Sequence, residues 1–359
     1  MSGRTKAARS GRPVRSFDVG QRQDLFLIAA VTTVLVIRLQ LWATNYPSLS
    51  PGKLHIAHLL WGGVFMTAAI WILASYIGRK RVPLAVILGG IGFGFFIDEV
   101  GKFVTADNNY FFKPTAAIIY VVFIVLYLTS RWIGHRRFGE RGRIANAAEL
   151  ASERYVDGMN PLERQTAIEL LEPIKGNAQA GELLAAIRSS PVGPPDEYGR
   201  LVRLVLWMQR TYDDWVRTGW FQVLMIGAVV VGILITAFGI IDLIFLSGNP
   251  GSAASPGYAT DGISNLKLVN AIPLASSSVA SLIALVGIVP LLRGERIKAY
   301  RRFRMGLMIA VFVTYPFIFA ENSFSAVSGL LLTLAALGTI SAMLHQEEQE
   351  KSAAGAPAG

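Results

Sequence analysis

The hydrophobic positions of this chain fall into long runs separated by polar segments. A helix needs about 20 mostly apolar residues to cross the hydrocarbon core of a bilayer. Six runs each predict one span, and a final run predicts two, because the polar residues 321–323 interrupt it. The predicted spans are residues 25–44, 57–77, 84–105, 115–130, 219–246, 268–292, 305–320 and 325–344. We therefore expect an all-α fold, a polytopic membrane helix bundle of about eight transmembrane helices.

The polar segments divide the chain into five predicted parts. These are a basic cytoplasmic N-terminal tail (1–24), a first four-helix transmembrane half (25–130), a small helical cytoplasmic insert (131–218), a second four-helix half (219–344) and a disordered C-terminal tail (345–359). Within the insert, Asn160, Pro161 and Glu163 predict a helix start, because Asn caps a helix, Pro fits its first position and Glu favours its N-terminal dipole.

Composition and charge support this placement. Only 16% of the residues are charged, against about 25% in soluble domains. The absence of cysteine excludes disulfide scaffolds and Cys-ligated metal sites. Of the 34 Lys and Arg residues, 29 fall in segments 1–24, 78–83, 131–218, 293–304 and 345–359, which lie on one side of the predicted bundle. The positive-inside rule then predicts that both termini are cytoplasmic.

The same sorting accounts for the formal net charge of +10. Anionic lipids at the cytoplasmic face are the expected counter-charge. No nucleic-acid partner is expected, because no recognised binding module accompanies the basic residues.

The end of the insert has the pattern of an amphipathic helix. Spacing of about 100° per residue places its apolar side chains on one face and most of its arginines on the opposite face. The apolar residues are Leu201, Leu204, Val205, Met208, Tyr212, Trp215 and Val216, and the arginines are Arg203, Arg210 and Arg217. Two interpretations are open: the helix lies in the membrane interface, or its apolar face packs on the other helices of the insert.

Ionisable residues inside spans are costly and usually mark function. Arg38, Asp98 and Glu99 are predicted about two-thirds of the way across the membrane from the cytoplasm, and other polar residues share that outer half. The group consists of Arg38, Asp98, Glu99, Lys102, Asp107, Glu321 and Asn322. We expect an outward-facing pocket that binds or passes a small ligand or ion, with Asp98 and Glu99 holding a cation or proton against Arg38 and Lys102. The alternative is a salt-bridge network that only fixes helix packing.

Two histidines add a possible metal site. His55 and His58 lie at i and i+3 on one helical face, and Asp98 could complete a set suited to zinc or another divalent metal. With Glu99 as base, such a site predicts a membrane-embedded hydrolase or transferase acting on lipid or extracytoplasmic substrate. A third alternative is a scaffold whose cytoplasmic insert recruits a protein partner.

Two further patterns concern helix packing and symmetry. Gly90 and Gly94 have the spacing of a close helix crossing. Residues 103–110 and 317–324 share the order aromatic, aliphatic, any, Ala, acid, Asn, any, aromatic. This agreement predicts a parallel duplication, as in some transporters, and chance similarity of short segments is the alternative.

Three motifs carry a resemblance. They are His55-x-x-His58-Leu-Leu-Trp-Gly-Gly, the run from Phe96 to Phe103 with Asp98, Glu99 and Lys102, and Asp107-Asn108-Asn109-Tyr110-Phe111-Phe112. Together they resemble uncharacterised multi-spanning membrane proteins of bacteria, actinobacteria in particular, over about residues 50–125. The resemblance implies a bacterial plasma membrane and carries no activity with it.

Overall fold

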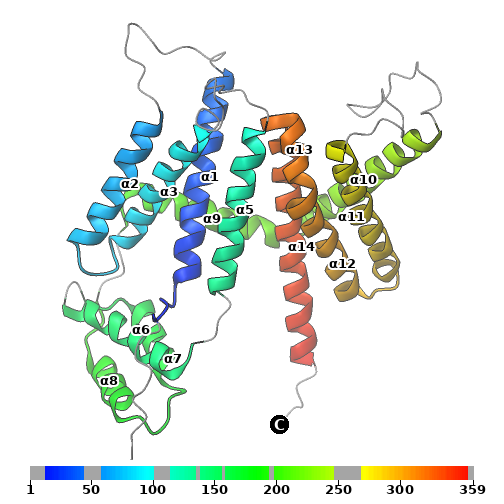
Figure 1. The fold of residues 1–359 in the computed structure, drawn as a ribbon. Coiled ribbons are helices and arrows are strands. Elements are labelled where there is room, and N and C mark those ends of the chain that lie inside the picture. Colours follow the sequence, from blue (N-terminus) through cyan, green and yellow to red (C-terminus); the bar gives the residue numbers. More distant parts are fainter. Residues whose placement is uncertain are drawn as a thin grey trace, which may run out of the picture. The chain divides into compact units, whose positions relative to one another are not determined.

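The computed structural model describes residues 13–43, 58–100, 114–134, 138–155, 158–193, 198–245 and 268–354. Every regular element in these ranges is a helix (Figure 1), which confirms the predicted all-α fold. The chain forms two compact units, Met1–Glu99 with Val125–Leu206, and Val100–Ile124 with Trp207–Gly359. The boundary falls within α5 (Thr115–Gly134) and α9 (Arg200–Arg217), and each unit is described by itself.

Three apolar helices build the membrane part of the first unit. They are α1 (Val19–Ala43), α2 (His58–Ser75) and α3 (Val82–Asp98). Proline stands in the first turn of α3, where its missing N–H costs no hydrogen bond. The helix ends at Asp98, whereas the sequence predicts a span that continues to residue 105. Asp98 therefore lies at the end of its helix and not two-thirds of the way along a longer one.

Glycines allow α3 to pack closely on both neighbours. A Cβ atom on Gly90 would lie 2.5 Å from the carbonyl oxygen of Phe26 in α1, and one on Gly94 would lie 2.7 Å from another α1 carbonyl. On the side of α2, a Cβ atom on Gly92 would lie 2.7 Å from the carbonyl oxygen of Gly62. No larger residue fits at these distances, so the predicted close crossing at Gly90 and Gly94 is confirmed.

The insert forms a small helical core in the first unit. Its elements are α6 (Glu140–Ser152), the 3₁₀ turn η1 (Glu153–Tyr155), α7 (Pro161–Leu171) and α8 (Ala178–Ser189). As predicted, α7 starts at Asn160: the Asn160 side chain accepts the Glu163 N–H at 2.8 Å, and the Glu163 carboxylate accepts the Asn160 N–H at 3.1 Å. Leu150, Met159 and Ile187 are fully buried between these helices.

The first turns of α9 pack on membrane helices. Val202 is 3% exposed and lies with Ala29 of α1 and Ile87 of α3. Of the apolar face predicted from the sequence, Val205 packs on the same cluster, while Leu204 is 53% and Trp215 52% exposed. Among the described residues, the apolar core of the insert contains no α9 side chain. Both interpretations of this face stay open, because α9 from Trp207 onward belongs to the second unit.

The second unit contains the remaining long helices. They are α10 (Gly219–Phe245), α11 (Leu268–Leu292), α12 (Arg296–Ile309), the π-helix η3 (Ala310–Thr314), α13 (Tyr315–Asn322), the 3₁₀ turn η4 (Ser323–Ala326) and α14 (Val327–Ala354). Their core joins α10, α11, α12 and α14 around Phe303 and Ile340, which are 1% and 0% exposed.

Proline explains the π-helical turn. Inside this turn the Tyr315 N–H donates to the carbonyl of Ala310, five residues earlier. The carbonyl of Val311 would need the N–H of residue 316, which is a proline and has none. The Tyr120 hydroxyl of α5 donates to that carbonyl instead, at 2.7 Å.

The final apolar run folds back on itself, as the sequence predicts. Ser323 has a positive φ of 52°, which is uncommon outside glycine and ends α13 sharply. Phe303 of α12 and Ile340 of α14 share one core, so the two arms lie side by side.

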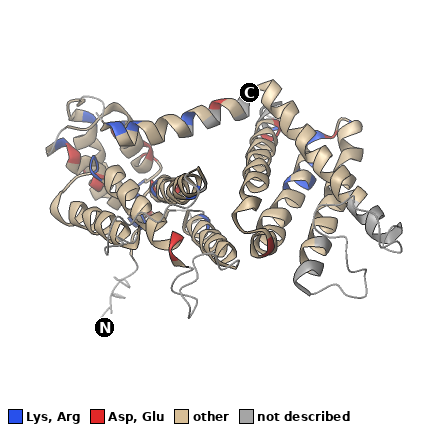
Figure 2. Ribbon diagram, turned by 90° about the horizontal axis from the view of Figure 1, so that it is seen from above, with Lys and Arg blue, Asp and Glu red and all other residues tan. Residues whose placement is uncertain are grey.

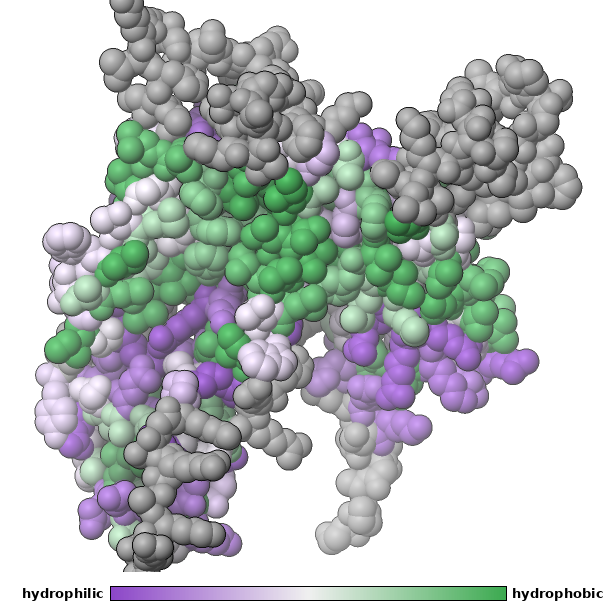
Figure 3. All heavy atoms as spheres, viewed as in Figure 1, coloured by the Kyte–Doolittle hydropathy of each residue, from purple (hydrophilic) through white to green (hydrophobic). Residues whose placement is uncertain are grey.

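The surfaces of both units are those of membrane helices. Six helical stretches are long and apolar enough to cross a membrane, the last being the whole segment Arg296–Glu348, and α3 is a shorter apolar helix. Only 11–28% of the residues in these stretches are buried. In each unit the apolar helices present hydrophobic residues outward (Figure 3) and carry few charges along most of their length (Figure 2). Apolar surface of this extent indicates an integral membrane protein.

Candidate functional site

Arg38 and Asp98 form a buried ion pair between α1 and α3. The Nε atom of Arg38 lies 2.6 Å from Oδ1 of Asp98, and a terminal nitrogen of Arg38 donates to the Asp98 carbonyl oxygen at 3.0 Å. Asp98 is 1% exposed. The close α1–α3 crossing positions this pair, because it brings the end of α3 against the last turns of α1. One guanidinium thus holds both the side chain and the main chain of Asp98.

Glu99, the next residue, has a different partner. Its Oε1 atom accepts the backbone N–H of His58 at 2.7 Å, and the Nδ1 atom of His58 lies 3.9 Å from the same oxygen. His58 is the first residue of α2, so this carboxylate lies at a helix N-terminus, where free N–H groups and the helix dipole favour negative charge. Glu99 is 1% exposed, and the His58 side chain is 32% exposed.

We name Arg38, His58, Asp98 and Glu99 the Asp98 cluster. The sequence predicts Arg38, Asp98 and Glu99 as pocket residues and His58 and Asp98 as metal ligands, and the structure brings all four together. Three other predicted site residues, His55, Lys102 and Asp107, lie outside the described residues. Glu321 and Asn322, at the end of α13, belong to the second unit.

The described part of the Asp98 cluster does not by itself form a metal site. Within the described part of the chain, no three His, Asp or Glu side chains are grouped to hold a metal ion. Asp98 is engaged by Arg38, and the Nδ1 atom of His58 lies 3.9 Å from Oε1 of Glu99. The predicted zinc site stays a prediction, because it also needs His55.

A second ionic cluster lies at the other end of the same helices. Arg79, in the loop between α2 and α3, pairs with Asp18 before α1 and with Glu149 of α6, the latter at 2.9 Å. The Arg79 backbone N–H donates to Glu153 at 2.8 Å, and Arg22 pairs with Asp18 at 2.9 Å. This Arg79 cluster ties the insert to the ends of the membrane helices. The side chain of Arg79 is only 10% exposed.

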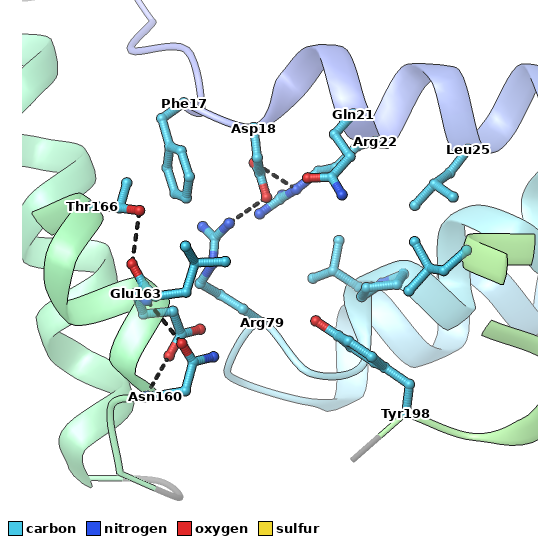
Figure 4. A pocket seen from close by; sticks show the side chains of 14 residues that line it. Phe17, Asp18, Gln21, Arg22, Leu25, Arg79, Asn160, Glu163, Thr166 and Tyr198 are labelled. Atoms are coloured by element: carbon cyan, nitrogen blue, oxygen red, sulfur yellow. Dashed lines mark hydrogen bonds and ion pairs between the residues drawn. The ribbon is translucent and has the colours of Figure 1, made fainter. Parts of the chain in front are cut away.

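The Arg79 cluster borders a narrow cleft. The cleft has a volume of about 180 Å³ and is lined by residues of α1, the α2–α3 loop, α7 and the segment before α9. Figure 4 shows Asp18 and Arg79 facing one another on one side, with Asn160 and Glu163 of α7 on another. Small-molecule pockets are usually 300–1,000 Å³, so the volume is small for a substrate. The arrangement fits a joint between the insert and the membrane helices.

Sequence reasoning missed the Arg79 cluster. It placed Arg79 in a basic cytoplasmic segment and named no partner for it. A signal was available: Asp18 and Arg22 have i,i+4 spacing, and so do residues 149 and 153, which predicts two charged helix faces. Nothing in that spacing identifies Arg79 as the partner, since it lies 61 residues from Asp18 and 70 from Glu149.

The two clusters lie on either side of the apolar part of α1. Asp18 and Arg38 are 20 residues apart, and 20 helical residues extend about 30 Å. Residues 21–24 within this stretch are polar, so the apolar section between the clusters runs from Leu25 to Ile37. The first unit therefore has an ionic cluster at each end of this apolar section.

Comparison of the chain with protein-family models, with curated proteins and with solved structures finds no match. Its chemistry has to be inferred from these two clusters and the surfaces around them.

Proposed function

We propose that the chain is a multi-pass protein of the bacterial plasma membrane, with eight spans and both termini in the cytoplasm. Two observations support the count: α3 packs between α1 and α2 as an apolar helix, and the final run folds into two arms. The orientation is supported by the basic loops 78–83 and 293–304, which lie at corresponding ends of the predicted topology. In this orientation the Asp98 cluster lies at the outer end of the first unit.

We propose further that the Asp98 cluster binds or passes a proton or a small cation, with Glu99 as the exchanging group. The single observation that carries this proposal is the division of partners between two adjacent buried carboxylates. Asp98 receives two hydrogen bonds from Arg38, so its charge is compensated by a permanent cation. Glu99 instead accepts the His58 backbone N–H and has the His58 imidazole, a group able to bind and release a proton, 3.9 Å from the same oxygen. The Glu99–His58 pair can therefore take up and release a proton while the Arg38–Asp98 pair holds the helices.

Infrared difference spectroscopy of the full-length protein in neutral detergent tests the assignment. We expect a carboxyl band that titrates in the wild type and is absent in Glu99→Gln. The band should be retained in Asp98→Asn. In His58→Gln, which keeps the backbone N–H and removes the imidazole, the pH at which the band titrates should shift. Circular dichroism selects variants that keep their helix content.

If the carboxyl band found in the wild type still titrates in folded Glu99→Gln, the assignment of that band to Glu99 is overturned. Proton and cation flux in proteoliposomes then separates binding from passage. Flux lost in Glu99→Gln and kept in the matched Glu182→Gln variant, at an exposed position in α8, supports a pathway.

A membrane-embedded metal-dependent hydrolase or transferase is the second candidate. The approach of His58 to Glu99, at 3.9 Å, favours it, because a metal-bound water needs a base close to a ligand. Metal analysis of purified wild type and of His55→Ala/His58→Ala is the test. Stoichiometric zinc in the wild type that is lost in the variant supports the enzyme, and no metal in either supports the proton or cation site.

A further inference from the structure

The three basic residues of the α2–α3 loop divide between two environments. Arg79 is held by Asp18 and Glu149 in the Arg79 cluster. Its neighbours Lys80 and Arg81 line a different cleft, of about 410 Å³, together with Arg200 at the start of α9. All of these residues belong to the first unit. The cleft therefore draws positive charge from two segments that are more than a hundred residues apart in the chain.

The lining of this cleft combines positive charge with exposed apolar and aromatic surface. Tyr76 is 59%, Ile77 88% and Leu201 38% exposed, and the Arg81 guanidinium lies 5.7 Å from the centre of the Tyr76 ring. Among the described residues, the acidic residue that lines the cleft is Glu153, whose Oε1 atom accepts the Arg79 backbone N–H at 2.8 Å. The described lining therefore holds three basic residues and one acidic residue.

We propose that this cleft binds the phosphate headgroup of an anionic phospholipid. Lys and Arg are the usual phosphate ligands, and Arg can hold two phosphate oxygens at once. Tyr side chains are enriched where headgroups meet acyl chains, and Ile77 and Leu201 offer apolar surface for the start of an acyl chain. The volume falls in the range of small-molecule sites.

α9 supports a lipid source for the phosphate. Its Val202 side packs on α1 and α3, while Leu201, which lines the cleft, and Leu204, three residues further along the helix, are exposed. A helix fixed in this way next to a phosphate site has the character of an interfacial helix. The inference rests on the proposed membrane placement, which puts the α2–α3 loop at the cytoplasmic boundary. It is independent of proton or cation exchange at Glu99.

Native mass spectrometry of the full-length protein in neutral detergent tests the site. The probes are phosphatidylglycerol, phosphatidylcholine and glycerol 3-phosphate, titrated separately. The variant Lys80→Gln/Arg81→Gln/Arg200→Gln removes the three cations, and Arg141→Gln/Lys175→Gln/Arg188→Gln removes the same charge from insert positions outside the cleft. Each basic residue near an anionic lipid surface raises the affinity for it about fivefold. We expect the cleft variant to lose about tenfold or more in affinity for phosphatidylglycerol and the matched variant to keep it.

The charge-preserving variant Lys80→Arg/Arg81→Lys/Arg200→Lys should retain phosphatidylglycerol binding, which separates the site from a folding defect. Equal loss in the cleft variant and the matched variant would overturn the proposal. Affinity for phosphatidylcholine equal to that for phosphatidylglycerol would also overturn it. So would binding of glycerol 3-phosphate as tight as that of phosphatidylglycerol, because it would indicate a soluble ligand. The carboxyl titration of Glu99 is read out separately, so failure of one proposal leaves the other measurable.

Discussion

Adjacent residues at the end of α3 have separate roles because their partners come from different helices. Asp98 faces α1 and pairs with Arg38, while Glu99 faces the start of α2. The sequence shows both carboxylates and the depth of Arg38, so it predicts their proximity. It does not show which carboxylate takes the arginine, because that depends on the rotation of α3 set by its glycine contacts.

The Arg38–Asp98 pair should behave as one unit in stability measurements. Removing one partner of a buried pair leaves an uncompensated charge and is strongly destabilising. We expect Asp98→Asn and Arg38→Gln each to lower the free energy of unfolding in detergent by about 2 kcal/mol or more. The double variant should cost clearly less than the two single costs together. Additive costs would contradict a direct pair, and Glu321→Gln, in the second unit, serves as the control for removal of a carboxylate.

At the scale of elements, local signals were predictable and long-range partners were not. The cap at Asn160, the Gly90–Gly94 crossing and the break before Ser323 each depend on residues a few positions apart, and the structure confirms them. The end of α3 and the packed face of α9 depend on neighbours far away in the chain. For α9, the hydrophobic period shows an apolar face, but only the contact with α1 and α3 shows that Val202 and Val205 are the residues that pack on the membrane helices.

Two adjacent glycines of α2 provide a matched test of the α2–α3 crossing. A Cβ atom on Gly62 would lie 2.8 Å from the carbonyl oxygen of Gly92, whereas Gly63 has nothing within 4 Å. Overpacking a tight contact costs about 1–3 kcal/mol, so Gly62→Ala should lower the thermal stability of the protein. Gly63→Ala should leave it unchanged or raise it slightly, because alanine favours a helix over glycine. Equal effects of the two substitutions in thermal unfolding would argue against the crossing.

At the scale of the molecule, the distribution of charge is what the sequence predicts best. Basic residues gather in segments that a membrane topology places on one side, and this pattern depends only on order along the chain. The structure adds that part of this charge is engaged, because Arg79 is paired with acids of α6 and the segment before α1. The net charge of +10 therefore overstates the positive charge that can interact with lipid headgroups. At the α2–α3 loop, the basic residues that line the proposed lipid cleft are Lys80 and Arg81.

Thiol labelling checks the proposed orientation without interference, because the chain has no cysteine of its own. Ser152→Cys and Ser189→Cys place a thiol in the insert, and Ser48→Cys and Ser255→Cys place one in segments that the sequence predicts to lie outside. With a membrane-impermeant maleimide, we expect the two outer positions to react in right-side-out vesicles and the two insert positions to react in inside-out vesicles. The physical reason is that 29 of the 34 Lys and Arg residues, which resist translocation, lie in the segments assigned to the cytoplasm. Labelling of the insert from the outside would reverse the orientation and place the Asp98 cluster at the cytoplasmic end. Reaction of Ser48→Cys and Ser255→Cys on opposite sides would instead show that the number of spans between them is odd, which contradicts the eight-span topology.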